Sequence, residues 1–199
     1  MKTVDIIDGH AFLRPLNYLR IRNDYAVWYN WVYPTLLSAL LFLSVYYGNW
    51  SDKPKVILAP IDEFGSILTV LFPFYFASLA AISSLSGVPS LDKKFKMKNP
   101  VSLFIKLSKT EYDTLYLTPR DFLSLLFSYC TTTSLVLLLI SFTEDALVMQ
   151  LTKAGTYAPC LSTATLIIIV FLFSQLLIST LLGVYFLSDY MVRNRERSD

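Results

Sequence analysis

Four long apolar runs alternate with polar segments along this chain. The runs cover residues 26–47, 67–86, 122–142 and 163–187, and none of them contains Asp, Glu, Lys or Arg. An α-helix of about 20 apolar residues spans the hydrocarbon core of a bilayer. The pattern therefore predicts an all-α integral membrane protein with four transmembrane helices in a domain of residues 26–190. An arm of residues 1–25 precedes this domain, and a tail of residues 191–199 follows it.

The central loop, residues 87–120, has a different periodicity in its second half. Residues 101–107 and 111–117 alternate apolar and polar positions on either side of a Ser-Lys-Thr sequence, which is typical of a small β-hairpin. A hairpin alone is marginally stable in water, so we expect it to dock on another surface. Thr118 and Pro119 then supply an N-cap and a first-turn proline, so the third helix should begin there.

The N-terminal arm allows two interpretations. Leu16 and Leu19 alternate with Arg14 and Arg20 at spacings compatible with an amphipathic helix. Such a helix can lie at the inner membrane interface with its arginines toward lipid phosphates. In the other interpretation, the arm folds onto its own chain.

Charge sorts these segments to two sides of the membrane. Of the 17 Lys and Arg residues, fourteen lie in the arm, the central loop and the tail, and three lie in the first and third loops. Cytoplasmic loops of membrane proteins carry the excess of Lys and Arg. The arm, the central loop and the tail are therefore predicted to be cytoplasmic, with both termini inside. The composition, 54% hydrophobic and 16% charged, agrees with a membrane protein.

Polar side chains inside the spans identify candidate contacts between helices. The third span contains Thr132 and Thr133, whose hydroxyls can bond to their own helix. The fourth contains Ser174 and Gln175 near its middle. Because a glutamine amide cannot be satisfied within its own helix, we expect Gln175 to bond across to Thr132 or Thr133. Pro34 removes a backbone hydrogen bond in the first span and is expected to bend it.

The usual signatures of catalysis and metal binding do not occur in the sequence. His10 is the single histidine, Cys130 and Cys160 are predicted to be free thiols, and there is no Gly-rich phosphate loop or nucleophile motif. The spans lack the charged groups that proton relays and coupled carriers use. We therefore expect no enzyme, no metal and no cofactor.

These features favour a membrane platform that binds copies of itself and a cytoplasmic partner. Small residues in the second span, from Ala77 to Ser84, should let another helix approach closely. The candidate partner-binding residues are the basic ones of the central loop and the tail: Lys93, Lys94, Lys96, Lys98, Arg193, Arg195 and Arg197. Their charge suits an acidic protein, anionic lipid or nucleic acid. Of these we expect a partner protein, with anionic lipid as the alternative, and no direct binding of nucleic acid.

In its architecture the chain resembles the small membrane subunit of the two-component Kiwa anti-phage defence system of bacteria. The resemblance covers the four spans, the two cytoplasmic termini and the Lys-rich middle loop, which includes Lys93, Lys94, Lys96 and Lys98. It implies a homo-oligomer, a tetramer, in the bacterial inner membrane. It also implies that the chain senses phage attack and works with a cytoplasmic DNA-binding subunit.

Two other classes of function stay open. An oligomeric channel or small-molecule transporter would have a pore lined by Thr131, Thr132, Ser174 and Gln175. A membrane-disrupting effector of the holin or toxin type needs fewer spans and a shorter inner loop than this chain has.

Overall fold

The computed structural model describes residues 11–21, 25–48, 60–84, 101–106, 112–153 and 157–190, and this part of the chain is mostly helical. Its elements in chain order are the 3-10 helix η1 (Ala11–Arg20), the π-helix η2 (Trp28–Val32), α1 (Tyr33–Gly48), α3 (Pro60–Ser84), β1 (Ser102–Lys106), β2 (Tyr112–Tyr116), α5 (Pro119–Phe142), α6 (Glu144–Thr152), α7 (Ala158–Tyr185) and the π-helix η4 (Phe186–Tyr190).

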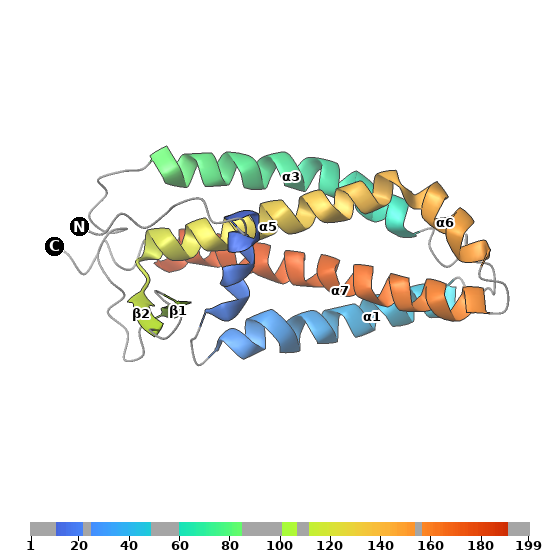
Figure 1. The fold of residues 1–199 in the computed structure, drawn as a ribbon, viewed down its shortest axis with the longest axis horizontal. Coiled ribbons are helices and arrows are strands. Elements are labelled where there is room, and N and C mark those ends of the chain that lie inside the picture. The colour runs from blue at the N-terminus through green and yellow to red at the C-terminus, as the bar shows by residue number, and fades with distance from the viewer. Residues whose placement is uncertain are drawn as a thin grey trace.

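The four long helices lie side by side in the order α3, α5, α7, α1 (Figure 1). Neighbouring helices run in opposite directions. As a result, the start of α1, the end of α3, the β-hairpin, the start of α5 and the end of α7 share one end of the bundle, which we call the hairpin end. α6 covers the opposite end (Figure 1). The predicted cytoplasmic segments that are described, η1 and the hairpin, thus lie toward the same end.

Three helices are long and apolar enough to cross a membrane: α3, α5 and the helix from Ala158 to Ser188. The first predicted span, residues 26–47, contains η2 followed directly by α1, whose α-helical part has 16 residues. Its helix bounds agree with the prediction, although α1 alone is shorter than the other three.

The second helix begins earlier than predicted. α3 starts at Pro60, within the segment expected to be an outer loop, and not at residue 67. Asp62 and Glu63 occupy its first turn, where carboxylates stabilise a helix by facing the positive end of its dipole. The charges that excluded these residues from the apolar run therefore mark the start of the helix.

The predicted start of the third helix is confirmed. Thr118 is the N-cap, and its hydroxyl accepts a hydrogen bond of 3.2 Å from the backbone N–H of Asp121. In return, the Asp121 carboxylate accepts a bond of 3.0 Å from the backbone N–H of Thr118. This reciprocal capping box satisfies two N–H groups that a helix start otherwise leaves free.

The predicted β-hairpin is also confirmed. β1 and β2 pair antiparallel, with Ser102 opposite Tyr116 and Lys106 opposite Tyr112. The hairpin docks on its own bundle, because Val101, Leu103 and Leu117 are buried in the common core. β1 also contacts η1. These contacts supply the surface that a two-stranded hairpin needs.

The third loop and the fourth helix differ from the prediction. The loop contains the short helix α6, and α7 begins at Ala158, five residues before the predicted span. Pro159 lies in the first turn of α7, where its fixed φ favours a helix start. Cys160 is therefore part of the helix and exposed, whereas Cys130 is buried, and both are free thiols as predicted.

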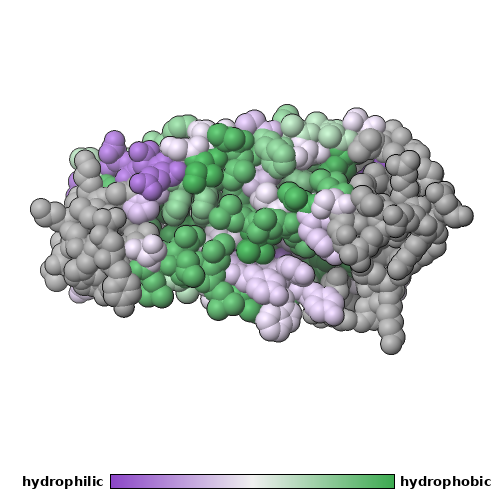
Figure 2. Space-filling model, turned by 180° about the vertical axis from the view of Figure 1, so that it is seen from behind, coloured by the Kyte–Doolittle hydropathy of each residue, from purple (hydrophilic) through white to green (hydrophobic). Residues whose placement is uncertain are grey.

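The outer surface between the two ends of the bundle is largely apolar. Figure 2 shows a hydrophobic band across the middle of one face, with a hydrophilic patch toward one end. Large side chains exposed in this region include Leu36 and Leu40 on α1, Val70 on α3 and Leu181 on α7. An apolar surface of this extent suits the hydrocarbon core of a bilayer.

Candidate functional site

A stripe of polar side chains on α7 is the main polar feature of the buried core. Ser174, Gln175 and Ser179 are buried, and Thr180 is half-buried beside them. Gln175 and Ser179 are four residues apart and so lie on one face of the helix. Because the rest of α7 is strongly apolar, this stripe is where other elements can form hydrogen bonds to it.

Gln175 bonds across to two elements. The Tyr129 hydroxyl on α5 donates to its side-chain oxygen over 2.7 Å. Its amide nitrogen donates to the backbone oxygen of Asn30 in η2 over 3.1 Å. A bond across from Gln175 was expected, but the partners are Tyr129 and Asn30, and not Thr132 or Thr133.

The backbone oxygen of Asn30 can accept this bond because the residue four positions later is a proline. In an α-helix, the N–H of residue 34 would donate to the oxygen of Asn30. Residue 34 is proline and has no N–H, and it is buried. The backbone forms a π-helix here, with the Tyr33 N–H donating to the oxygen of Trp28. The Gln175 amide therefore supplies a donor that Pro34 cannot provide.

Two further tyrosines connect the stripe to other elements. The hydroxyls of Tyr75 on α3 and Thr180 lie 2.5 Å apart. Tyr18 on η1 is buried, stacks on Tyr129 with 5.2 Å between ring centroids, and lies beside Ser179. The buried Ser179 hydroxyl makes no hydrogen bond within the described part of the chain. Burial raises the pKa of the Tyr18 hydroxyl above its ordinary value, and Ser179 opposes part of this effect.

The stripe therefore contacts α3, α5, η1 and η2, and η2 continues directly into α1. We call the set of Tyr18, Asn30, Tyr75, Tyr129, Gln175, Ser179 and Thr180 the polar core. It contains hydroxyls, the Gln175 amide and the backbone oxygen of Asn30, and the buried thiol of Cys130 lies among its tyrosines. These groups can hold helices in register, since each polar group in an apolar environment is costly to leave without a partner.

The remaining predicted intramembrane residues have local roles. Thr132 donates to the oxygen of Ser128 in its own helix over 2.9 Å. Thr133 is buried and interacts with the Tyr129 hydroxyl, so it joins the polar core through that tyrosine. Ser174 is fully buried, and its hydroxyl makes no hydrogen bond within the described part of the chain.

The predicted partner-binding residues lie outside the described residues. This applies to Lys93, Lys94, Lys96 and Lys98 of the central loop and to Arg193, Arg195 and Arg197 of the tail. Their role stays a prediction. The β-hairpin follows these lysines in the sequence. Its position shows at which end of the bundle the central loop reaches α5 (Figure 1).

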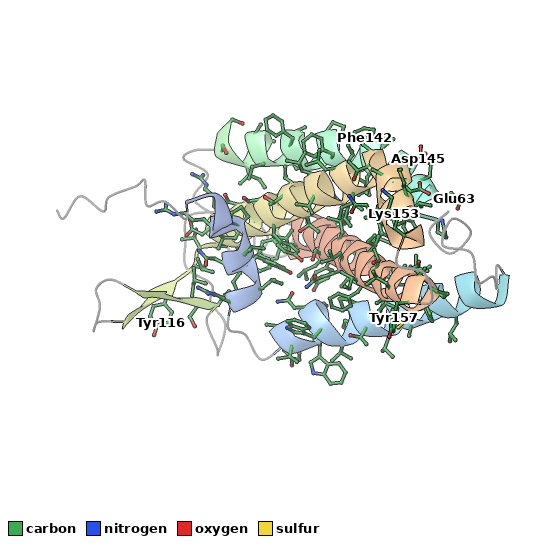
Figure 3. The ribbon with its side chains drawn as sticks, turned by 45° about the vertical axis from the view of Figure 1, so that its right-hand side comes forward. Glu63, Tyr116, Phe142, Asp145, Lys153 and Tyr157 are labelled. Atoms are coloured by element: carbon green, nitrogen blue, oxygen red, sulfur yellow. The ribbon has the colours of Figure 1, made fainter. Side chains whose placement is uncertain are left out.

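The end of the bundle opposite the hairpin carries charged side chains of both signs. Glu63 on α3, Asp145 on α6 and Lys153 after α6 lie there, far from Tyr116 of the hairpin (Figure 3). Within the described ranges, no group of three or more His, Cys, Asp or Glu side chains is placed to hold a metal ion.

Of the polar core, the sequence predicted Gln175 alone. The members that it did not predict are Tyr18, Asn30, Tyr75, Tyr129, Ser179 and Thr180. The sequence does contain a signal for Asn30. Its backbone oxygen lacks the usual helical donor, because Asn30 lies four residues before a proline inside an apolar run. The tyrosines carry no such signal, since aromatic side chains are common throughout these spans. No protein-family model, curated protein or solved structure matches this chain.

Proposed function

We propose that this chain is a four-span protein of the bacterial inner membrane with its hairpin end in the cytoplasm. Three apolar helices support the membrane location. The fourth span would be η2 with α1, which packs along α7 (Figure 1). The excess of Lys and Arg in the arm, the central loop and the tail supports the orientation.

Its function in this proposal is that of a non-enzymatic platform or sensor that self-associates and recruits a cytoplasmic partner. The observation that carries the proposal is a stripe of small residues on α3 that the described part of the chain leaves exposed. Pro73, Ala77, Ala80 and Ser84 follow one another at spacings of three or four residues and are all exposed. We call them the α3 stripe.

A second copy of the chain is the occupant that suits the α3 stripe. Small residues at this spacing let two helix backbones approach closely, and close packing drives helix association where lipid tails give no hydrophobic drive. Large apolar side chains, such as Val70 at 71% exposure and Phe76 at 61%, flank the stripe. They would pack around such a contact.

The partner would dock on the basic loop and the tail. The hairpin attaches the loop to the bundle through the buried side chains of Val101, Leu103 and Leu117. The lysines come just before this attached hairpin in the sequence. Seven of the 17 basic residues lie in this loop, and a partner protein with an acidic face would complement them. Under the resemblance to the Kiwa membrane subunit, this partner is a DNA-binding protein and the function is defence against phage.

The alternative, a channel or transporter, receives less support. A pore enclosed by several copies needs polar side chains on the surface of each copy. Ser174 is 0% and Gln175 is 2% exposed, and Gln175 is engaged by Tyr129 and Asn30. These side chains serve packing within one copy.

Two sets of variants test the platform. Replacing Lys93, Lys94, Lys96 and Lys98 with Glu should release a chemically crosslinked cytoplasmic partner and leave the oligomer intact. Lys153→Glu, at the opposite end, is the control for charge reversal and should keep the partner. Loss of the partner in both variants, or in neither, would contradict the docking proposal.

The oligomer is tested separately. Ala77→Leu with Ala80→Leu should lower the number of copies per particle in single-molecule photobleaching, because the larger side chains separate the backbones. Ala39→Leu with Ala164→Leu, which enlarges two exposed alanines on α1 and α7 by the same amount, is the matched control. An unchanged copy number in the double variant would exclude the α3 stripe as the contact.

A further inference from the structure

The 3-10 helix η1 presents three different faces. A 3-10 helix has three residues per turn, so residues three apart share a face. Arg14, Asn17 and Arg20 form one face, on which both arginines are exposed. Tyr18 and Ile21 form the buried face, and the Ile21 N–H continues the pattern by donating to the oxygen of Tyr18.

The third face of η1 is apolar. Leu16 is 43% exposed, and Leu19 packs partly against the core. η1 therefore has one side directed into the bundle, one apolar side and one basic side. A division into an apolar and a basic side is typical of segments that lie in the plane of a membrane interface.

The position of η1 agrees with this division. It runs across the bundle, at a steep angle to the long helices, near the start of α1 (Figure 1). The first turn of that span exposes Trp28, and such aromatic residues concentrate where the hydrocarbon core meets the headgroups. In this proposal η1 lies at the inner margin of the hydrocarbon core, from which long arginine side chains can extend outward to lipid phosphates.

We propose that η1 binds anionic phospholipid of the cytoplasmic leaflet through Arg14 and Arg20, and that this contact stabilises the insertion of Tyr18 into the polar core. An arginine guanidinium can form two parallel hydrogen bonds to a phosphate. Leu16 would face the adjoining acyl chains. The interaction is with a membrane surface of negative charge, and it needs no second protein.

The binding of lipid would be transmitted to α1 by contacts within the bundle. Tyr18 stacks on Tyr129, Tyr129 donates to Gln175, and Gln175 donates to Asn30. The same side chains thus connect the lipid-facing helix to the π-helical turn of the first span. Holding η1 in place would stabilise that turn as well.

Hydrogen exchange of the whole protein in nanodiscs tests this proposal. One set of discs contains phosphatidylcholine alone, and the other contains equal parts of phosphatidylcholine and phosphatidylglycerol. A basic residue near an anionic surface changes an equilibrium about fivefold, and two change it roughly 30-fold. Amides of residues 11–21 should therefore exchange up to roughly 30-fold more slowly in the anionic discs.

The arginine variants identify the source of the effect. In Arg14→Gln with Arg20→Gln, exchange should be equal in the two discs. Lys153→Gln, which removes a charge at the opposite end, should respond to phosphatidylglycerol as the wild type does. Equal exchange of wild-type residues 11–21 in both discs would overturn the proposal, and this result needs no variant to fold. A response retained by the double variant would overturn it too.

Discs loaded with a single copy separate this inference from self-association. The proposal rests on the membrane location of the bundle and on its cytoplasmic hairpin end. It does not depend on the α3 stripe or on a partner. A monomeric protein should show the full response, so failure of the platform proposal and failure of the lipid proposal give different results.

Discussion

Gln175 on α7 donates its side-chain amide to the backbone oxygen of Asn30 in η2 over 3.1 Å. Asn30 lies four residues before Pro34, at the position whose usual donor proline lacks. α1 packs chiefly on α7. This bond therefore fixes η2 and α1 to the rest of the bundle at one defined height.

Gln175→Leu should destabilise the bundle by about 1–3 kcal/mol. The change keeps the approximate volume and removes the partners of both the Tyr129 hydroxyl and the Asn30 oxygen, and bonds between membrane helices are each worth about 0.6 to 1.7 kcal/mol. Reversible unfolding in detergent measures the difference. Gln150→Leu on α6, which is exposed, is the matched control and should have little effect. Equal losses in both variants would show that the two bonds contribute nothing.

Pro34→Ala should reduce the cost of losing Gln175. Alanine restores an N–H at residue 34, which can donate to the Asn30 oxygen once the π-turn becomes α-helical. In this background, Gln175→Leu should cost about 0.5–1.5 kcal/mol less, the net value of one hydrogen bond. A double-mutant cycle on unfolding free energies measures this coupling. Additive effects would mean that Pro34 and Gln175 do not act on the same oxygen.

Gly65→Ala should separate α3 from α5. A Cβ at residue 65 would lie 2.9 Å from the Cβ of Ser141, which is closer than two carbon atoms can approach without movement. Overpacking of this kind costs about 1–3 kcal/mol. Combining it with Ser141→Gly should recover most of that stability, because the clashing atoms are removed. Thermal unfolding in nanodiscs would reveal the recovery, and its absence would place the strain elsewhere.

Tyr18→Ala should release η1 from the bundle. The buried ring packs on Tyr129 and Phe122, and removing a buried aromatic side chain costs about 3–5 kcal/mol. Limited proteolysis with trypsin should then cleave after the exposed Arg20 much faster than in the wild type. Leu16→Ala on the exposed face is the control and should leave cleavage unchanged. Equal cleavage of all three proteins would contradict the docking of the arm through Tyr18.

The sequence predicted those element boundaries at which capping residues, prolines or a strict apolar–polar alternation occur. Thr118 with Pro119 specified the start of α5, and the alternation around residues 101–117 specified the hairpin. Pro60 with Asp62 gives a similar start signal for α3. The uncharged run alone begins only at residue 67, because Asp62 and Glu63 interrupt it, although a carboxylate in the first turn stabilises a helix.

The polar core was only partly predictable, for a physical reason. A buried glutamine needs a partner, so a bond from Gln175 to another helix follows from the sequence. The identity of its partners depends on the rotation of each helix about its axis, which the nearly uniform apolar spans do not determine. Docking of η1 on its own chain was one of the two interpretations of the arm. The sequence did not decide between them, because the faces of η1 repeat every three residues and not at the α-helical period.

The most direct test of the account is the side of the membrane on which each end of the bundle lies. Cys130 is buried and Cys160 is exposed at the end opposite the hairpin, so the wild type provides one external probe. In spheroplasts, a membrane-impermeant maleimide should label wild-type Cys160 without permeabilisation. A variant with Cys160→Ser and Lys94→Cys should be labelled only after permeabilisation. Labelling of this variant in intact spheroplasts, with Cys160 protected in the wild type, would contradict a cytoplasmic docking surface.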